Sequence, residues 1–241
     1  MNIIHILNMT LSRTLLLAGT SVVVVAHSRA AAQPPGAGAQ RAVIWADSLV
    51  LHANIADVKV VRASADSVVV EVLPSSSKCG ADSTRLDVRP LKRGTSAVTV
   101  VAPRKCRVAL SITAPAAVSI DLTVDDGEVR VAGGTRPVSV RGKAVDVYFD
   151  AVAAPVTVAL HVGDIKWQSG IELRRGFTLR SGVGSVRYRV DGEQLRSGQS
   201  PGSGDHLSIP GGNNAVPVRL QTGVGSVVVD VSTQTPPDSR R

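Results

Sequence analysis

Aromatic residues are rare in this sequence: tryptophan, tyrosine and phenylalanine contribute two residues each among 241. The hydrophobic core must therefore be built mainly from valine, leucine, isoleucine and alanine. An apolar segment at residues 15–26 is shorter than the roughly 20 residues that a transmembrane helix requires. No later stretch is long enough, so we expect no transmembrane segment in the mature chain.

Motifs for catalysis and metal binding are absent or incomplete. The histidines after residue 32 (His52, His161 and His206) form no H-x-H or H-E-x-x-H pattern, and no P-loop or dinucleotide-binding fingerprint occurs. Residues 198–202 match the G-x-S-x-G form of a hydrolase nucleophile elbow, but they lie in a segment rich in glycine and serine with no helix after it. We expect a non-catalytic protein that holds no metal and no cofactor.

Cysteine is scarce as well, with only Cys79 and Cys106 present. Two cysteines in an exported protein suggest one disulfide, although two unrelated thiols are the alternative. The bond would close a loop of about 28 residues and stabilise the fold by roughly 3–4 kcal/mol in the chain-entropy model. A redox-active pair normally has the closer C-x-x-C spacing, which these residues lack.

The chain carries 27 basic and 19 acidic residues, a formal net charge of +8. The basic residues are spread along the sequence, which suits association with an anionic envelope polymer, lipid head groups or an envelope protein. No basic run is interleaved with exposed aromatic residues, so nucleic acid is not an expected partner.

Residues 1–32 have the features of a secretory signal peptide. Arg13 precedes the apolar segment, no acidic residue occurs before Asp47, and three consecutive alanines close the segment. Either Met1 or Met9 can be the start of translation. We therefore expect an exported protein that is periplasmic, extracellular or attached to the cell surface.

The second half of the chain contains a pattern of thirteen residues that occurs five times. Positions 2, 4, 11 and 13 of the pattern are apolar in every copy, and position 9 is glycine in four copies. Each copy therefore predicts two short strands joined by a tight turn, with glycines at the turn supplying positive φ. The copies are residues 119–131, 137–149, 155–167, 176–188 and 217–229.

The spacing of the copies predicts an all-β fold, a β-solenoid of stacked short strands with about 18–21 residues per repeat. We expect no substantial helix after the signal peptide. The predicted organisation is a flexible linker at 33–40, one domain at 41–232 and a disordered tail at 233–241. Within the domain, 41–115 holds N-terminal strands, 119–231 holds the repeats, and 191–215 is a loop inserted between the last two copies. The N-terminal runs are residues 42–45, 58–61, 68–72, 86–88, 98–101 and 108–112.

The side chains of each copy divide between the core and a polar outer face. The row at position 13 contains three aromatic residues, Phe149, Trp167 and Tyr188, which we interpret as a ladder inside the core. Positions 10 and 12 point the other way and place an acidic row beside a basic row. This outer face is either a solvated, mutually compensating surface or a binding face. Its candidate binding residues are Glu128, Arg130, Asp146, Asp164, Lys166 and Arg187.

Several segments resemble a known family. The sequences VGDIKW, SGVGSVRY and TGVGSVVV within the copies are similar to those of the bacterial putative-adhesin family of domains of unknown function, and residues 57–61 and 66–72 resemble its opening strands. The resemblance covers about residues 41–232. It implies an extracytoplasmic β-repeat domain and brings no catalytic residues with it. This chain departs from the pattern at Val145, which stands where other copies have glycine.

These features favour a non-catalytic binding or scaffolding module, adhesin-like, at the bacterial cell envelope. One alternative is an enzyme acting on polysaccharide through Asp146 and Asp164, which would then line a cleft. The other alternative is an accessory subunit in envelope stress sensing, for which a partner would have to relay the signal.

Overall fold

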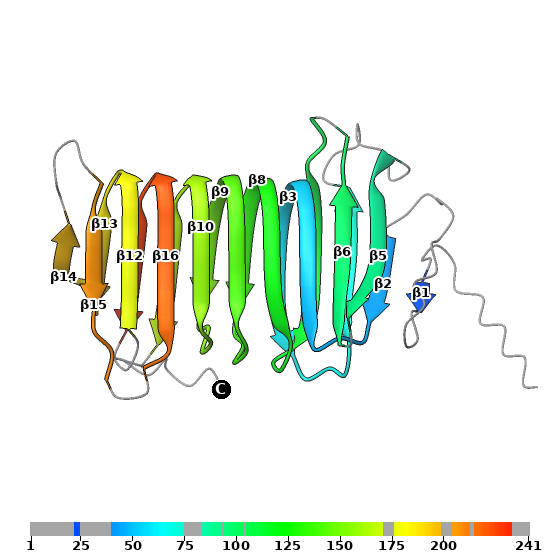
Figure 1. Ribbon diagram of the computed structural model, residues 1–241, viewed down its shortest axis with the longest axis horizontal. Coiled ribbons are helices and arrows are strands. Elements are labelled where there is room, and N and C mark those ends of the chain that lie inside the picture. Colours follow the sequence, from blue (N-terminus) through cyan, green and yellow to red (C-terminus); the bar gives the residue numbers. More distant parts are fainter. Residues whose placement is uncertain are drawn as a thin grey trace, which may run out of the picture.

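The structure, a computed structural model, describes residues 22–24, 40–74, 83–92, 94–103, 105–170, 176–198, 204–212 and 215–232. Over these ranges the chain forms strands and no α-helix, as the sequence predicts, and the strands lie side by side along one long axis (Figure 1). The strands are β1 (Val22–Val24), β2 (Gln40–Ile44), β3 (Ser48–Ala63), β4 (Val68–Pro74), β5 (Arg85–Lys92), β6 (Thr95–Val101), β7 (Val108–Pro115), β8 (Ser119–Ala132), β9 (Val138–Asp150), β10 (Val156–Val162), β11 (Ile165–Gly170), β12 (Gly176–Val183), β13 (Val186–Val190), β14 (Glu193–Gly198), β15 (His206–Ile209), β16 (Pro217–Val224) and β17 (Val227–Ser232).

The five predicted copies pair with one another in parallel and in register. Ile120 lies opposite Val138, and Val138 lies opposite Val156, so position 2 of one copy faces position 2 of the next. The first half of each copy joins one sheet layer, and the second half joins a facing layer. We call these the first layer (β10, β12, β16 and the first halves of β3, β8 and β9) and the second layer (β11, β13, β17 and the second halves of β3, β8 and β9). Positions 2, 4, 11 and 13 are buried between them.

The order of the copies along the sheet differs from their order in the chain. The third copy (β10 and β11) pairs with the fifth copy (β16 and β17), and the fifth copy pairs with the fourth (β12 and β13). The last copy is therefore inserted between the third and the fourth, as the orange β16 between β10 and β12 shows in Figure 1. The chain must travel outward through the fourth copy and then return.

A sixth copy, which the sequence pattern did not reveal, lies in β3. Ser48 pairs with Ser119, so residues 48–60 take positions 1 to 13, with Leu49 and Leu51 at the buried positions of the first half. Its position 9 is Ala56 instead of glycine, which hides the similarity. On the far side of β3, β6 pairs with its first half and β7 with its second half, both in parallel.

Antiparallel strands complete both ends of the sheet. At one end β14 pairs with β13, and β15 pairs with β12; at the other end β5 pairs with β6, and β4 pairs with β7 and β2. The prediction that 191–215 is a loop is therefore wrong for β14 and β15. β14 is held by edge pairing, and its Leu195 is 56% exposed, so it lacks the alternation of buried apolar residues that marks a strand in sequence. β15 does alternate, with Leu207 and Ile209 partly buried against the core, but the run is only four residues long.

The six N-terminal runs predicted as strands all fall in or at the ends of β2 to β7, which confirms them. Gln40, assigned to the linker, belongs to β2. Of the predicted signal peptide, only β1 is described, and it pairs in parallel with β2. The rest of the signal peptide, residues 33–39 of the linker, the tail at 233–241 and Cys79 lie outside the described residues, so those predictions and the disulfide to Cys106 remain predictions. In the part of the chain that the structure describes, no helix is long and apolar enough to cross a membrane.

The glycines at position 9 are required by both backbone conformation and space. Gly163 has φ of 136° and Gly225 has φ of 140°, in the region that favours glycine. A Cβ on either residue would overlap a backbone carbonyl oxygen of the neighbouring copy, that of Val145 for Gly163 and that of Gly163 for Gly225. Gly182 and Gly223 do not have the positive φ that we predicted. A Cβ at either position would clash with the backbone of the neighbouring strand, so these positions require glycine for space and not for φ.

The second copy replaces the position-9 glycine with a compensating pair. Val145 is 1% exposed, so its side chain turns into the core instead of lying at the turn. Gly142, at position 6, provides the space: a Cβ there would lie 2.7 Å from Cγ2 of Val145 and 3.0 Å from Cδ2 of Leu160. Other copies fill this space from position 6, with Val124 and Leu160 for example.

The aromatic ladder lies in the core, as predicted. Phe149, Trp167 and Tyr188 are at most 6% exposed, and burial raises the pKa of Tyr188. The ladder is not continuous along position 13, because the inserted fifth copy places Val229 between Trp167 and Tyr188. Phe177, from the first layer, makes the connection, with its ring centroid 6.0 Å from that of Trp167 and 5.9 Å from that of Tyr188.

Candidate binding faces

The predicted binding residues share the outer face of the second layer. Glu128 lies opposite Asp146, and both Arg130 and Lys166 lie opposite Tyr148. This face therefore brings together five of the six residues, namely Glu128, Arg130, Asp146, Asp164 and Lys166. Arg187 points from the same face but is separated from Lys166 by Val228, because the fifth copy intervenes.

The acidic row on this face is used to hold neighbouring copies together. Oδ1 of Asp146 accepts a hydrogen bond from the backbone N–H of Asp164 at 2.9 Å. Oδ1 of Asp164 in turn accepts the backbone N–H of Ser226 at 2.7 Å and its hydroxyl at 3.0 Å. Asp57 does the same for the backbone N–H of Glu128, at 3.1 Å. These carboxylates thus satisfy backbone donors at the turns, which is a structural role.

The basic row is partly occupied by its own neighbours. Arg130 donates to the carboxylate of Glu128, and this hydrogen bond raises the pKa of Arg130. The Arg130 guanidinium also lies 5.1 Å from the ring centroid of Tyr148, and Nζ of Lys166 lies 5.3 Å from it. Since Tyr148 stands between them in the sheet, two cations flank one ring. The two cations therefore compete with a sugar or base for stacking on the Tyr148 ring.

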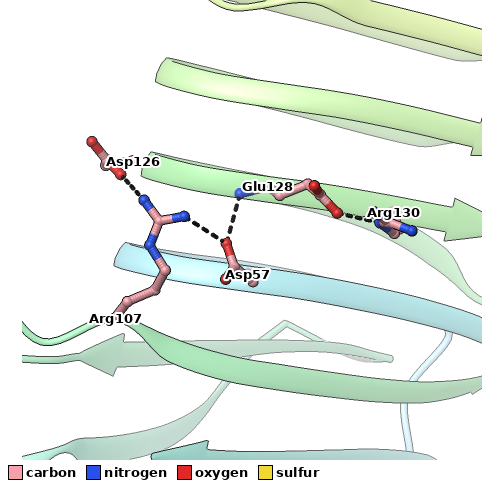
Figure 2. Close-up of polar contacts among 5 residues, drawn as sticks. All are labelled: Asp57, Arg107, Asp126, Glu128 and Arg130. Carbon is pink, nitrogen blue, oxygen red and sulfur yellow. Dashed lines mark hydrogen bonds and ion pairs between the residues drawn. The ribbon is translucent and has the colours of Figure 1, made fainter. Parts of the chain in front are cut away.

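Arg107 links the turn after β6 to two neighbouring copies (Figure 2). Its guanidinium donates to Oδ1 of Asp57 at 3.1 Å and to Oδ1 of Asp126 at 2.8 Å. Beside this contact is a shallow hollow of about 310 Å³, lined by Arg107, Asp126, Asp146, Val162 and nearby turn residues. It lies at the turn edge of the sheet, and the ion pairs at its rim leave little unpaired charge.

The second-layer face is therefore a largely compensated surface. Its acidic and basic rows alternate, and the acidic residues bind backbone while Arg130 binds Glu128. This arrangement matches the solvated, mutually compensating surface that the sequence left as one alternative. Within the described ranges, no group of three or more metal-binding side chains is placed to hold an ion.

The outer face of the first layer has a different character, which the sequence reasoning missed. This part of the face comprises positions 3 and 5 of β9, β10, β16 and β12, together with the β15 residues that pair with β12. Apart from Ala159, the outward side chains there carry hydroxyl, amide or basic groups. None of those that the structure describes is acidic. Seen in order along the sheet, they are Ser139 and Arg141, Thr157 and Ala159, Arg219 and Gln221, Thr178 and Arg180, and Ser208 and His206.

Among the described residues of this first-layer face, two arginines form no ion pair. Arg141 forms an ion pair with Asp121 at 2.9 Å, whereas Arg180 and Arg219 form none with any described carboxylate. Asp205, just before β15, is buried at 3% exposure and lies beside the inward-facing Ser181. A signal for this face was present in the sequence, because positions 3 and 5 contain no acidic residue from the second copy to the fifth.

Comparisons with known proteins show which folds the chain is similar to and do not identify its function. No protein-family model matches the chain, and no curated protein matches it. Among solved structures, the chain is similar to a putative cell adhesion protein from Clostridium sporogenes, with a TM-score of 0.52 and 11% identity, over 81% of this chain and 100% of that one. A weaker likeness is to a putative adhesin from Bacteroides fragilis, with a TM-score of 0.33 and 12% identity, over 82% of this chain and 98% of that one.

Proposed function

We propose that this chain is an exported, non-catalytic β-solenoid that acts as an adhesin-like binding module at the bacterial cell envelope. The observation that carries the proposal is the pair of outer faces, on which outward polar side chains repeat once per paired copy. Strands in a sheet lie about 4.8 Å apart, so these side chains form regular rows. A surface of this kind suits contact with an extended partner better than enclosure of a small substrate.

The solenoid assignment is supported by the parallel, in-register pairing of six copies between β3 and β17. The similar fold of the Clostridium sporogenes protein, which is described as a putative cell adhesion protein, supports a role in binding. The proposed signal peptide at residues 1–32 supports export. The partner we propose is an envelope polymer or an envelope protein.

The geometry favours binding over catalysis at Asp146 and Asp164. A glycosidase needs two carboxyl groups that flank a substrate and are free to transfer a proton or attack it. Here each carboxylate accepts a backbone hydrogen bond from the next copy, at 2.9 Å for Asp146 and 2.7 Å for Asp164. Both groups also point outward from the second layer instead of into an enclosed site.

Co-sedimentation of the protein with purified envelope fractions, at low and at high salt, tests the proposed function. We expect the protein to pellet with the envelope at low salt and to be released in part by high salt, because exposed charges are screened within about 8 Å at physiological ionic strength. A protein that stays in the supernatant at both salt concentrations would contradict the proposal. An unrelated β-sheet protein of similar net charge serves as the control for non-specific adsorption.

A further inference from the structure

The first-layer face over β9, β10, β16, β12 and β15 has both the charge and the shape of an anion-binding surface. Arg180 and Arg219 are exposed and lie on neighbouring strands, at positions 5 and 3. His206 lies directly opposite Arg180 on β15, and Arg141 lies at the other end of the face. An arginine can hold a carboxylate or a phosphate through two parallel hydrogen bonds.

Hydroxyl groups fill the spaces between these basic residues. Ser139, Thr157, Thr178 and Ser208 share the row at position 3 with Arg219. Each hydroxyl can donate one hydrogen bond and accept two, so the row can exchange hydrogen bonds with sugar hydroxyls. The face carries no aromatic side chain among its described outward residues, so recognition would depend on hydrogen bonds and charge.

The arginines are also spaced along the sheet instead of clustered at one point. Arg141 and Arg180 are three strand spacings apart, about 14 Å, and Arg219 lies between them. A small anion could contact Arg180 and Arg219, which are diagonal neighbours on adjacent strands, but not Arg141 as well. A linear ligand that runs across the strands, with anionic groups at intervals, can contact all of them.

Resting on the proposed function, we propose that this face binds a linear anionic polysaccharide, whose carboxylate or phosphate groups pair with Arg180 and Arg219. The hydroxyl groups on either side of Arg219 in the position-3 row contact the neutral parts of the sugar chain. The inserted fifth copy is essential to the site, because it brings Arg219 on β16 next to Thr178 on β12.

The test measures dissociation constants for four probes: polygalacturonate, which carries carboxylates, a phosphomannan, which carries phosphates, neutral mannan, and vesicles containing phosphatidylglycerol. The variant Arg180→Gln/Arg219→Gln removes two positive charges from the first-layer face. The control Lys59→Gln/Arg85→Gln removes two positive charges from exposed residues of β3 and β5, outside the first-layer face over β9, β10, β16, β12 and β15. The two variants therefore have equal net charge and differ in whether this face has changed.

We expect the wild-type protein to bind at least one of the two anionic polysaccharides and to bind mannan more weakly. The Arg180/Arg219 variant should lose about tenfold in affinity, and the control variant should stay within about twofold. The preferred probe identifies the anionic group. Equal losses in the two variants, no loss in either, or binding to vesicles alone would overturn the proposal.

The same variants separate this inference from the proposed function. If the wild-type protein sediments with envelope fractions and the Arg180/Arg219 variant does so equally well, the chain is an envelope-binding module that uses another surface. If the wild-type protein does not sediment at all, the proposed function itself fails.

Discussion

Replacing Gly163 with alanine is expected to lower the free energy of unfolding by about 3–5 kcal/mol. Gly163 has φ of 136°, which side chains with a Cβ rarely adopt, and its Cβ would overlap the carbonyl oxygen of Val145. That oxygen belongs to the backbone of the adjacent copy, so a rotamer change cannot remove the clash. Relief requires the two copies to separate at the turn. Chemical denaturation followed by circular dichroism measures the change.

Two other glycines provide matched controls for this prediction. Gly192 has φ of 79° but nothing within 4 Å of a Cβ, so Gly192→Ala measures the cost of placing alanine at positive φ without a steric clash. Gly212 has neither a positive φ nor a neighbour within 4 Å, so Gly212→Ala should be close to neutral. We expect the order of destabilisation to be Gly163, then Gly192, then Gly212. Equal effects at Gly163 and Gly192 would show that the copies do not approach closely at the turn.

A second large effect is expected at the compensating pair in the second copy. Gly142→Val should destabilise the protein by about 3 kcal/mol, because the new side chain would compete with Val145 for the same space. Val145→Gly should destabilise it by about 3–4 kcal/mol, since it leaves a cavity and adds backbone freedom to the unfolded chain.

The double variant Gly142→Val/Val145→Gly should recover most of this loss. It restores the arrangement of the other copies, in which position 6 fills the core and position 9 is glycine. We expect it to be within about 1 kcal/mol of the wild-type protein, which corresponds to a strong coupling in a double-mutant cycle. If the two losses simply add, the two residues do not share one space, and our explanation of Val145 is wrong.

Much of the fold follows from the sequence because one rule is repeated. Alternating apolar positions and glycine turns predicted the two strands of each of the third, fourth and fifth copies and the burial of Phe149, Trp167 and Tyr188. The first and second copies each form one continuous strand, β8 and β9, instead of the two short strands that we predicted. The copy in β3 was missed because it has Ala56 where four of the other five copies have glycine. At position 9 of the β3 copy the small side chain of alanine is accommodated. Whether a residue is accommodated at this position depends on the neighbouring strands, which the sequence pattern does not show.

The order of the copies could not be read from the pattern. Every copy presents the same apolar positions to its neighbours, so a stack in chain order would bury equivalent side chains. The cap strands β14 and β15 decide the arrangement: they cover the outer edges of the fourth copy and leave its inner edges for β16 and β17. Their segment, rich in glycine and serine, looks like a loop in sequence.

The candidate binding faces, too, could be predicted from the sequence only in part. The sequence placed Glu128, Arg130, Asp146, Asp164 and Lys166 correctly on one outer face, but their hydrogen bonds to backbone and to one another depend on the pairing of the copies. The first-layer face was missed because Arg219 and Arg180 belong to copies whose adjacency exists only through the exchange in order.

The measurement that tests the account most directly is a disulfide cross-link between copies. In the variant Thr157→Cys/Arg219→Cys, the new thiols lie opposite each other on adjacent strands, about 4.8 Å apart, within the range of a disulfide. In the variant Thr157→Cys/Thr178→Cys, β16 lies between them, at about 9.6 Å, which is too far. We predict cross-linking in the first variant and none in the second, read by mass spectrometry after mild oxidation. Cross-linking in the second variant without cross-linking in the first would show that the copies stack in chain order and would contradict the account.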